Sequence, residues 1–370
     1  MITIPTDLLP LDGRFGCGPS KVRPEAVAAL AAASTDYLGT SHRQARVQFE
    51  VSALRNGIAE LFALPDGYEV MLGNGGTTAF WDAATFGLID HCSQHLCFGE
   101  FSSNFATAAA AAPFLGQPST IVAEPGTHPL PVSDASVDAY CLTHNETSTG
   151  VAMPLHRPAG AEGLVLVDAT SAAGGLRFDP HEVDVYYFAP QKCLASDGGL
   201  WLAAVSPAAI ERIERIAASD RWVPASLDLG IALENSRKDQ TYNTPALATI
   251  FLATQQVDWI NQQGGLEWAA TRCDTSAAAI YDWADASSYA TPFVAVAEER
   301  SHVVATIDLD ADVVDANMVS KVLRANGVLD TESYRKLGRN QVRVALFPSI
   351  DPADVTALTA CIDYVVAALA

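Results

Sequence analysis

The stretch 184–205, "DVYYFAPQKCLASDGGLWLAAV", has two apolar segments on either side of a turn that holds Gln191, Lys192 and a Gly-Gly pair. Each segment is apolar at consecutive positions, which is typical of a strand covered on both faces. A lysine is rarely buried without a partner, and a buried amine loses its proton readily. Lys192 is therefore either a surface residue in a turn or a neutral amine at a strand end, where it is a nucleophile for carbonyl carbon.

Outward from this stretch, short apolar strands alternate with helices from about residue 22 to residue 330. Segments such as "STIVAEP" and "GLVLVDATSAAGG" are predicted strands, whereas "RPEAVAALAAA" and "VQFEVSALRNGIAELFAL" are predicted helices. The alternation favours an α/β fold with a mixed, mostly parallel sheet covered by helices. After Pro245 the pattern becomes helical and then gives two strands around a helix. We expect a large domain at 15–255 and a smaller α+β domain that consists of residues 256–370 together with residues 1–14.

Composition excludes several classes of partner. The chain has 370 residues, 49% hydrophobic and 18% charged, which suffices for a large core. Its formal charge of −21 argues against nucleic acid and against an anionic membrane surface. Seven scattered cysteines, with no leader pattern in "MITIPTDLLPLDGRFG", indicate reduced thiols and a cytoplasmic location. We find no apolar run near the ~20 residues that a membrane helix needs.

Polar or special residues follow five of the predicted strands. In open α/β sheets, ligands bind beyond the carboxyl ends of the strands, so we expect these residues to meet at one edge. They are Gly73–Thr78, Phe101, Thr143–Thr149, Asp168–Ser171 and Gln191–Lys192.

Three of these strand ends together indicate one cofactor. A glycine-rich strand-to-helix turn at Gly73, Gly75 and Gly76 suits a phosphate, although it is not a Walker motif and glycines also serve packing. Asp168 ends a buried strand and is either a helix cap or the partner of a metal, an arginine or a protonated heterocycle. Lys192 lies 24 residues later. Pyridoxal phosphate needs all three: an amine for the imine, a carboxylate for the pyridine nitrogen and amides for the phosphate.

One cluster resembles a metal site only superficially. "HCSQHLC" (91–97) holds two histidines and two cysteines within seven residues. The segment reads as a helix end that runs into a strand, where alternation separates Cys97 from its neighbours, so the ligands do not converge. We predict no metal.

The motifs resemble those of a known family, over nearly the whole chain. They are "FGCGPSKVRPE" (15–25), "GTSHRQ" (39–44), "GEFSSNFA" (99–106), "THNETSTGV" (143–151), "VDATSAAGG" (167–175) and "FAPQKCLASDGG" (188–199). They are similar to the fold-type I, class-V pyridoxal-phosphate aminotransferases, and within them to the actinobacterial phosphoserine aminotransferase family.

The resemblance implies roles for cofactor-binding residues. Lys192 forms the imine and shuttles the proton, and Asp168 pairs with the pyridine nitrogen. Phe101 stacks on the ring where many relatives carry Trp. The other implied contacts are Thr147 near the phenolic oxygen, Gly76, Thr77 and Gln191 at the phosphate, and Asn243 and Thr244 at the phosphate of the neighbouring subunit's cofactor. A homodimer with shared active sites follows. Thr77 stands where bacterial relatives often have Arg, which leaves the phosphate to amides, hydroxyls and Gln191.

The resemblance also implies how a dianionic substrate binds. Arg343 in "QVRVALF" matches the arginine that holds the α-carboxylate. His42 and Arg43 match the pair that takes the phosphate or the γ-carboxylate. Arg339, or alternatively Arg335 and Lys336, completes that pocket; a solvated basic loop is the other interpretation of this segment.

The implied reaction transfers the amino group of L-glutamate to 3-phosphohydroxypyruvate and gives O-phospho-L-serine and 2-oxoglutarate. The resemblance also admits a related transamination in pyridoxine biosynthesis. Alternatives are another class-V enzyme, such as a serine–pyruvate or alanine–glyoxylate transaminase or a cysteine desulfurase, and a non-catalytic phosphate binder. A desulfurase needs a cysteine on a mobile loop, and neither Cys273 nor Cys361 has such a context.

Overall fold

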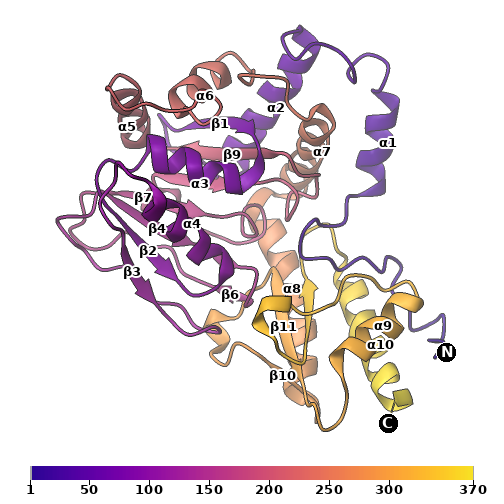
Figure 1. Cartoon of the computed structure of the whole chain (residues 1–370). Coiled ribbons are helices and arrows are strands. Elements are labelled where there is room, and N and C mark those ends of the chain that lie inside the picture. Colours follow the sequence, from indigo (N-terminus) through magenta and orange to yellow (C-terminus); the bar gives the residue numbers. More distant parts are fainter. Residues whose placement is uncertain (1, 370) are drawn as a thin grey trace.

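The computed structural model describes residues 2–369 and shows two units side by side (Figure 1). The larger one is built on a seven-stranded sheet of β1 (Glu69–Asn74), β2 (Ser93–Cys97), β3 (Ser119–Val122), β4 (Ala139–Thr143), β7 (Leu164–Asp168), β8 (Val185–Phe188) and β9 (Leu200–Val205). The order is β1-β9-β8-β7-β4-β2-β3, and β9 alone runs in the opposite direction to the other six strands. The predicted mixed, mostly parallel sheet is confirmed.

The strands are apolar at consecutive positions because each face of the sheet has its own core. In β9, Leu200 and Leu202 belong to the core on one face, whereas Trp201 and Val205 belong to the core on the other. Burying one such side chain contributes about 1.5–3 kcal/mol. Both faces must therefore be covered by helices.

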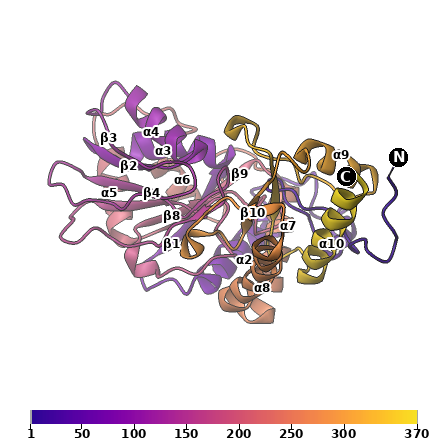
Figure 2. The same ribbon diagram turned by 90° about the horizontal axis from the view of Figure 1, so that it is seen from below.

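The helices divide between the two faces (Figure 2). One face is covered by α2 (Ala45–Leu61) and α7 (Leu247–Gln263); the other is covered by α3 (Gly76–Gly87), α4 (Glu100–Ala111), α5 (Pro207–Ala217) and α6 (Leu229–Ser236). Local signals set several helix starts: Ser206 accepts a hydrogen bond from the amide of Ala209, and Asp228 accepts one from Gly230. α1 (Pro24–Ala32) begins at a proline, as predicted, and stands at the edge of the molecule (Figure 1). A short hairpin is formed by β5 (Asn145–Glu146) and β6 (Val151–Ala152).

The smaller unit is an antiparallel sheet with helices on it. Its strands are β10 (Ala290–Pro292), β11 (Val304–Leu309) and β12 (Gln341–Ala345), in that order, and its helices are α8 (Gly265–Ala286), α9 (Ala316–Ala325) and α10 (Pro352–Leu369). By length and composition alone, α10 could cross a membrane. Its Leu358 and Ile362 are fully buried in this unit's core, as in the core helix of a globular domain.

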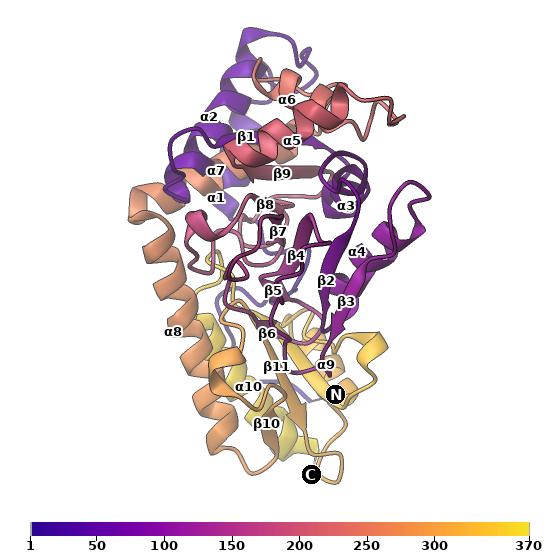
Figure 3. The same ribbon diagram turned by 90° about the vertical axis from the view of Figure 1, so that its left-hand side faces the viewer.

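The predicted boundary at 255/256 falls inside α7. Val257 and Ile260 of this helix pack in the core of the large sheet. The helix α7 ends just before Gly264. Gly264 and Gly265 both have positive φ (125° and 71°), and α8 then runs along the side of the molecule (Figure 3). Ala269 of α8 still contacts the large core, whereas Cys273 belongs to the small one.

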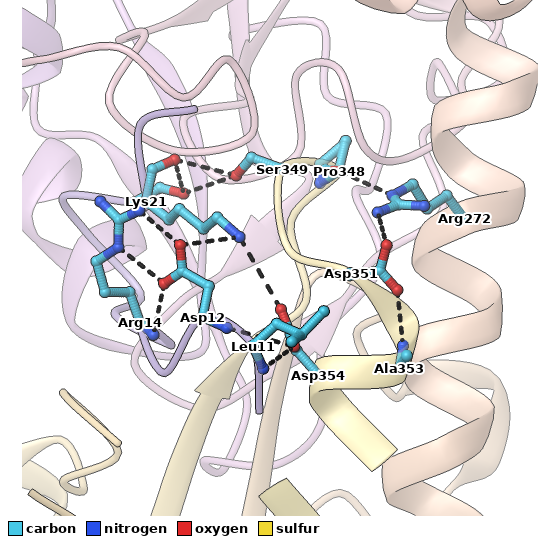
Figure 4. Close-up of polar contacts among 11 residues, drawn as sticks. Leu11, Asp12, Arg14, Lys21, Arg272, Pro348, Ser349, Asp351, Ala353 and Asp354 are labelled. Carbon is cyan, nitrogen blue, oxygen red and sulfur yellow. Dashed lines mark hydrogen bonds and ion pairs between the residues drawn. The ribbon is translucent and has the colours of Figure 1, made fainter. Parts of the chain in front are cut away.

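The N-terminal segment is fastened to the small unit by a polar cluster (Figure 4). Lys21 Nζ lies 3.2 Å from Asp12 Oδ2 and 4.0 Å from Asp354 Oδ2, at the start of α10. Arg14 Nη2 lies 2.6 Å from Asp12 Oδ2, and its hydrogen bond is the main cause that lowers the pKa of Asp12 to about 2. The segment that follows Asp12 is therefore held in place before it reaches the large sheet.

Candidate active site

A cavity of about 780 Å³ opens at the carboxyl ends of the large sheet's strands. The strand-end residues meet there because parallel strands present the same end to one edge. Seven predicted site residues line it: Gly76, Thr77, Phe101, Thr147, Asp168, Gln191 and Lys192. Six others do not: His42, Arg43, Asn243, Thr244, Arg339 and Arg343.

Lys192 lies after β8, and its side chain is buried in this cavity. Among the described residues, its Nζ has neither a hydrogen bond nor an ion pair; it lies 5.7 Å from the centre of the Phe101 ring. Burial lowers the pKa of this amine below its ordinary value, although the carboxylate of Asp168 opposes the effect. An unpartnered amine of lowered pKa is a nucleophile.

Gly18 closes one side of the Lys192 pocket. A Cβ at this position would lie 2.6 Å from Lys192 Cε and 2.8 Å from Nζ. The residue also has a φ of +145°. The positive φ favours glycine at this position, and any larger residue would displace the end of the flexible Lys192 side chain. The sequence analysis did not identify this contact, although Gly18 lies in the motif at 15–25.

Asp168 ends β7 and is buried beside the lysine's cavity. Thr170 donates to Oδ1 from its amide (3.0 Å) and from its hydroxyl (2.6 Å), and Trp81 Nε1 donates to Oδ2 at 3.0 Å. No arginine, lysine or histidine forms an ion pair with this carboxylate within residues 2–369. Burial raises the pKa of Asp168, whereas these hydrogen bonds lower it. A buried carboxylate without a protein cation fits a cationic ligand.

The helix α3 begins at the cavity. Gly75 and Gly76 have φ values of 111° and 71°, and no side chain caps the helix, so its first amides face the cavity. The Thr77 hydroxyl lies 2.7 Å from that of Thr170. Because Thr170 gives its hydroxyl proton to Asp168, Thr77 must give its own to Thr170. An anion at this helix start is therefore bound by amides rather than by the Thr77 hydroxyl.

The hairpin β5–β6 supplies further polar groups. Thr147 donates to Ser171 (2.8 Å), and Asn145 Nδ2 donates to the same hydroxyl (2.8 Å). Asn145 Oδ1 and Gln191 Oε1 are both buried without a hydrogen-bond partner in the described chain, and both residues line the cavity. Such orphaned groups indicate a polar ligand. Asn145 lies in the range Thr143–Thr149 that the sequence predicts at this edge, but the sequence assigns it no individual role.

A buried carboxylate fixes the helix that carries Phe101. Glu146 is fully buried and accepts hydrogen bonds from the amides of Phe101 (3.4 Å) and Ser102 (2.9 Å) at the start of α4. A negative charge at a helix N-terminus is favourable. The Phe101 ring then forms one wall of the cavity, 6.0 Å from the ring of Tyr334.

Arg343 reaches toward the cavity from β12. Its Nη1 donates to the carbonyl oxygen of Thr147 (3.2 Å), and the guanidinium lies 5.3 Å from the Tyr334 ring centre. Its Nε is buried without a partner, and no carboxylate pairs with it among residues 2–369. This guanidinium is free to bind an anion.

The other basic residues of this segment have different surroundings. Arg339 is held by both oxygens of Asp308 (3.0 Å each) and stacks on Phe293, so its guanidinium is engaged. Lys336 pairs with Glu100. Arg335 is exposed, with no ion pair in the described part of the chain. The structure does not bring Arg339 to the cavity, and its predicted contact with substrate remains a prediction.

His42, Arg43, Asn243 and Thr244 form a second cluster, outside the cavity. Thr244 Oγ1 lies 3.3 Å from His42 Nδ1, and Arg43 donates to Gln240 (3.0 Å). Asn243 and Thr244 are exposed, and His42 Nε2 is buried without a partner. Burial, with the adjacent Arg43, lowers the pKa of His42. The structure therefore places His42 beside Thr244, and Asn243 beside Asn74 at the end of β1, but brings none of the four predicted residues of this cluster to the cavity of Lys192.

The histidine–cysteine stretch at 91–97 is part of the fold. His95 is buried in β2 and bonds to the Ser93 hydroxyl (2.9 Å). Cys97 lies at the end of the same strand. Within residues 2–369 no group of three or more His, Cys, Asp or Glu side chains is arranged to hold a metal.

Comparisons with known proteins agree with this geometry. Residues 132–330 match the family model described as aminotransferase class-V. The chain is 60% identical over 367 residues to the phosphoserine aminotransferase of Rhodococcus jostii (strain RHA1), covering 99% of this chain and 98% of that protein. The fold is similar to the crystal structure of a phosphoserine aminotransferase from Cytophaga hutchinsonii (TM-score 0.87, 24% identity, 95% and 99% of the two chains). It is also similar to a pyridoxal-phosphate-bound phosphoserine aminotransferase from Trichomonas vaginalis (TM-score 0.79, 19% identity, 95% and 99% covered).

Proposed function

The chain belongs to the phosphoserine aminotransferases, a family of class-V aminotransferases, and on that premise we propose how its residues carry out the reaction. The enzyme transfers the amino group of L-glutamate to 3-phosphohydroxypyruvate, giving O-phospho-L-serine and 2-oxoglutarate. This is the activity that the sequence motifs predict. Its cofactor is pyridoxal 5′-phosphate, which is also the group bound in the structure from Trichomonas vaginalis.

One observation supports these roles most strongly: a buried amine and a buried carboxylate, neither paired with an opposite charge, face one cavity. Asp168 lacks a cation, and Lys192 lacks an anion, within the described chain. A heterocycle with a protonated nitrogen would supply the cation that Asp168 lacks. The aldehyde carbon of the same ring would react with the amine of Lys192. The amides at the start of α3 suit its phosphate. The residues present therefore fit pyridoxal phosphate.

When bound, pyridoxal phosphate supplies an electron sink that stabilises negative charge at the substrate's Cα. Asp168 would keep its ring nitrogen protonated. Lys192 would hold the cofactor through its amine and would move the proton at the substrate's Cα. Phe101 and Thr147, which line the same cavity, would contact its ring. The close approach of the Gly18 backbone to the Lys192 side chain limits where the lysine amine can lie in the cavity.

Substrate recognition needs two anion sites. Arg343 has a guanidinium without a carboxylate partner and is assigned the α-carboxylate, which its fork binds bidentately. His42 and Arg43 are assigned the second anionic group, the phosphate or the γ-carboxylate. Their distance from the cavity of their own chain is consistent with service to another copy, because Thr244, which touches His42, matches a residue that acts in trans.

We therefore infer a homodimer in which each cavity is completed by the His42–Thr244 cluster of the second copy. Asn243 and Thr244 are exposed and do not line their own chain's cavity, although Asn74, next to the cavity-lining Gly75, donates to their carbonyl oxygens. A cytoplasmic location is also proposed, because all seven cysteines are free thiols, as a reducing compartment requires. Cys273 and Cys361 are buried in helices, which disfavours a desulfurase.

The test is a coupled assay of the purified, cofactor-loaded protein with O-phospho-L-serine and 2-oxoglutarate, which follows L-glutamate. L-alanine or L-serine with glyoxylate serves as the comparison. We expect turnover with the phosphorylated donor and little with the others. Equal or greater turnover with alanine and glyoxylate would instead favour another class-V transaminase.

A further inference from the structure

Trp81 makes a contact for which the sequence analysis assigned no role. It lies on α3, is 6% exposed, and donates its indole N–H to Asp168 Oδ2 at 3.0 Å. We propose that Trp81 is a positioning residue that fixes the carboxylate of Asp168 toward the ring nitrogen of the cofactor. This inference rests on the proposed function, since it takes Asp168 to be the partner of that nitrogen.

The hydrogen bonds of Asp168 show why this contact matters. Oδ1 is held twice by Thr170, whereas Oδ2 has a single protein donor, Trp81. The terminal torsion of an aspartate is broad, so contacts at one oxygen alone leave its plane poorly defined. An indole N–H can donate but never accept. The contact therefore sets the plane of the carboxylate and stabilises it as an acceptor.

The position of Trp81 on α3 adds a second consequence. It lies five residues after Gly76, which is about 7.5 Å along the helix. The start of the same helix faces the phosphate position. One rigid helix thus fixes both ends of the cofactor site, the anion end through its first amides and the ring end through Trp81 and Asp168.

The ionised carboxylate of Asp168 is stabilised by neutral hydrogen-bond donors, because no cationic side chain forms an ion pair with it in the described chain. Burial raises the pKa of Asp168, as does the buried carboxylate of Glu146, while Thr170 and Trp81 lower it. Lys192 lies in the same cavity but forms no ion pair with Asp168 in the described chain. Without Trp81, the carboxylate retains protons more readily and gives less support to a protonated ring nitrogen.

The chain provides a matched control for the test. Trp201 on β9 is 3% exposed and packs in the same core cluster as Trp81, but its indole makes no hydrogen bond to Asp168. Trp81→Phe and Trp201→Phe thus remove the same atoms from the same core. We expect Trp81→Phe to lower kcat about tenfold, the loss typical of one hydrogen bond to a charged group, and Trp201→Phe to change it less than twofold. In an Asp168→Asn background, Trp81→Phe should have little further effect.

A second readout needs no cofactor. The apo protein has six tryptophans and hence six indole N–H signals in a ¹H–¹⁵N spectrum, of which Trp81→Phe removes one. That signal should shift with pH as Asp168 titrates, and Asp168→Asn should abolish the shift. The wild type and Asp168→Asn alone suffice if Trp81→Phe fails to fold: one signal should move between them far more than the rest.

The inference is overturned if Trp81→Phe and Trp201→Phe reduce kcat alike, if the two changes at positions 81 and 168 are additive, or if no indole signal responds to Asp168→Asn. If any of these results is found but the wild-type protein transaminates normally, the proposed function still holds and only the role of Trp81 is refuted. A wild-type protein that binds no pyridoxal phosphate would overturn the proposed function, and with it this role, whatever the spectra show.

Discussion

Replacing Gly18 with alanine tests whether the N-terminal segment aims Lys192. The new Cβ would lie 2.6 Å from Lys192 Cε, 2.8 Å from Nζ and 3.2 Å from Cδ. Carbon atoms pack at about 3.5–4.0 Å, so the lysine must retreat by about 1 Å. The segment itself cannot yield easily, because Lys21, three residues later, is fastened between Asp12 and Asp354 (Figure 4).

The size of the effect follows from this displacement. A reacting group misplaced by about 1 Å costs roughly 100-fold in rate. We therefore expect Gly18→Ala to lower kcat about 100-fold. Forcing alanine to the φ of +145° at this position should also cost about 1–3 kcal/mol of folding stability. A control must introduce alanine at a positive φ without the clash.

Gly160 provides that control. Its φ is +75°, and a Cβ there would meet nothing within 4 Å. The assay is kcat with O-phospho-L-serine and 2-oxoglutarate, together with thermal unfolding of each variant. Both variants should unfold at lower temperature than the wild type, and only Gly18→Ala should lose activity. If the two variants keep similar kcat values, the contact between Gly18 and Lys192 does not aim the amine.

Three further predictions concern the proposed roles. Asp168→Asn should lower transamination by orders of magnitude, because an amide cannot stabilise a protonated ring nitrogen and one charge-assisted hydrogen bond alone is worth about 1.5–3 kcal/mol; kcat within a few-fold of wild type would refute the role. Arg43→Ala should raise the KM for both phosphoserine and glutamate, since one site serves both, and should leave the poor rate with alanine unchanged; equal impairment with alanine would point to a structural role. Mixing Lys192→Ala subunits with Asn243→Ala/Thr244→Ala subunits should restore up to one working site per heterodimer, and no recovery after subunit exchange would argue against shared sites.

Much of the fold is predictable from the chain because its strands are buried on both faces. The run Leu164–Asp168 is apolar up to its last residue, so both the strand and the polar strand end can be recognised. Lys192 and Asp168 follow from the same pattern, since parallel strands end at one edge. The break at Gly264 was harder to predict, because helical sequence continues on both sides of it.

The contacts that sequence reasoning missed are those set by packing between distant segments. Trp81 looks like any core tryptophan of a helix, and its bond to Asp168 spans 87 residues. The engagement of Arg339 by Asp308 depends on the register in which β11 pairs with β12. His42 and Arg43 were identified by motif, but their place outside the cavity depends on where α2 and the segment around Thr244 pack.

Lys192 is proposed to hold the cofactor and to move the proton in amino transfer between glutamate and 3-phosphohydroxypyruvate. The most direct measurement is the formation of O-phospho-L-serine from these two substrates by the wild type and by Lys192→Ala, each loaded with pyridoxal phosphate and checked for folding and bound cofactor. We expect steady turnover by the wild type and none by Lys192→Ala, which should retain the cofactor without a covalent bond. Phosphoserine formed by Lys192→Ala at the wild-type rate, or none formed by the cofactor-loaded wild type, would contradict this proposal.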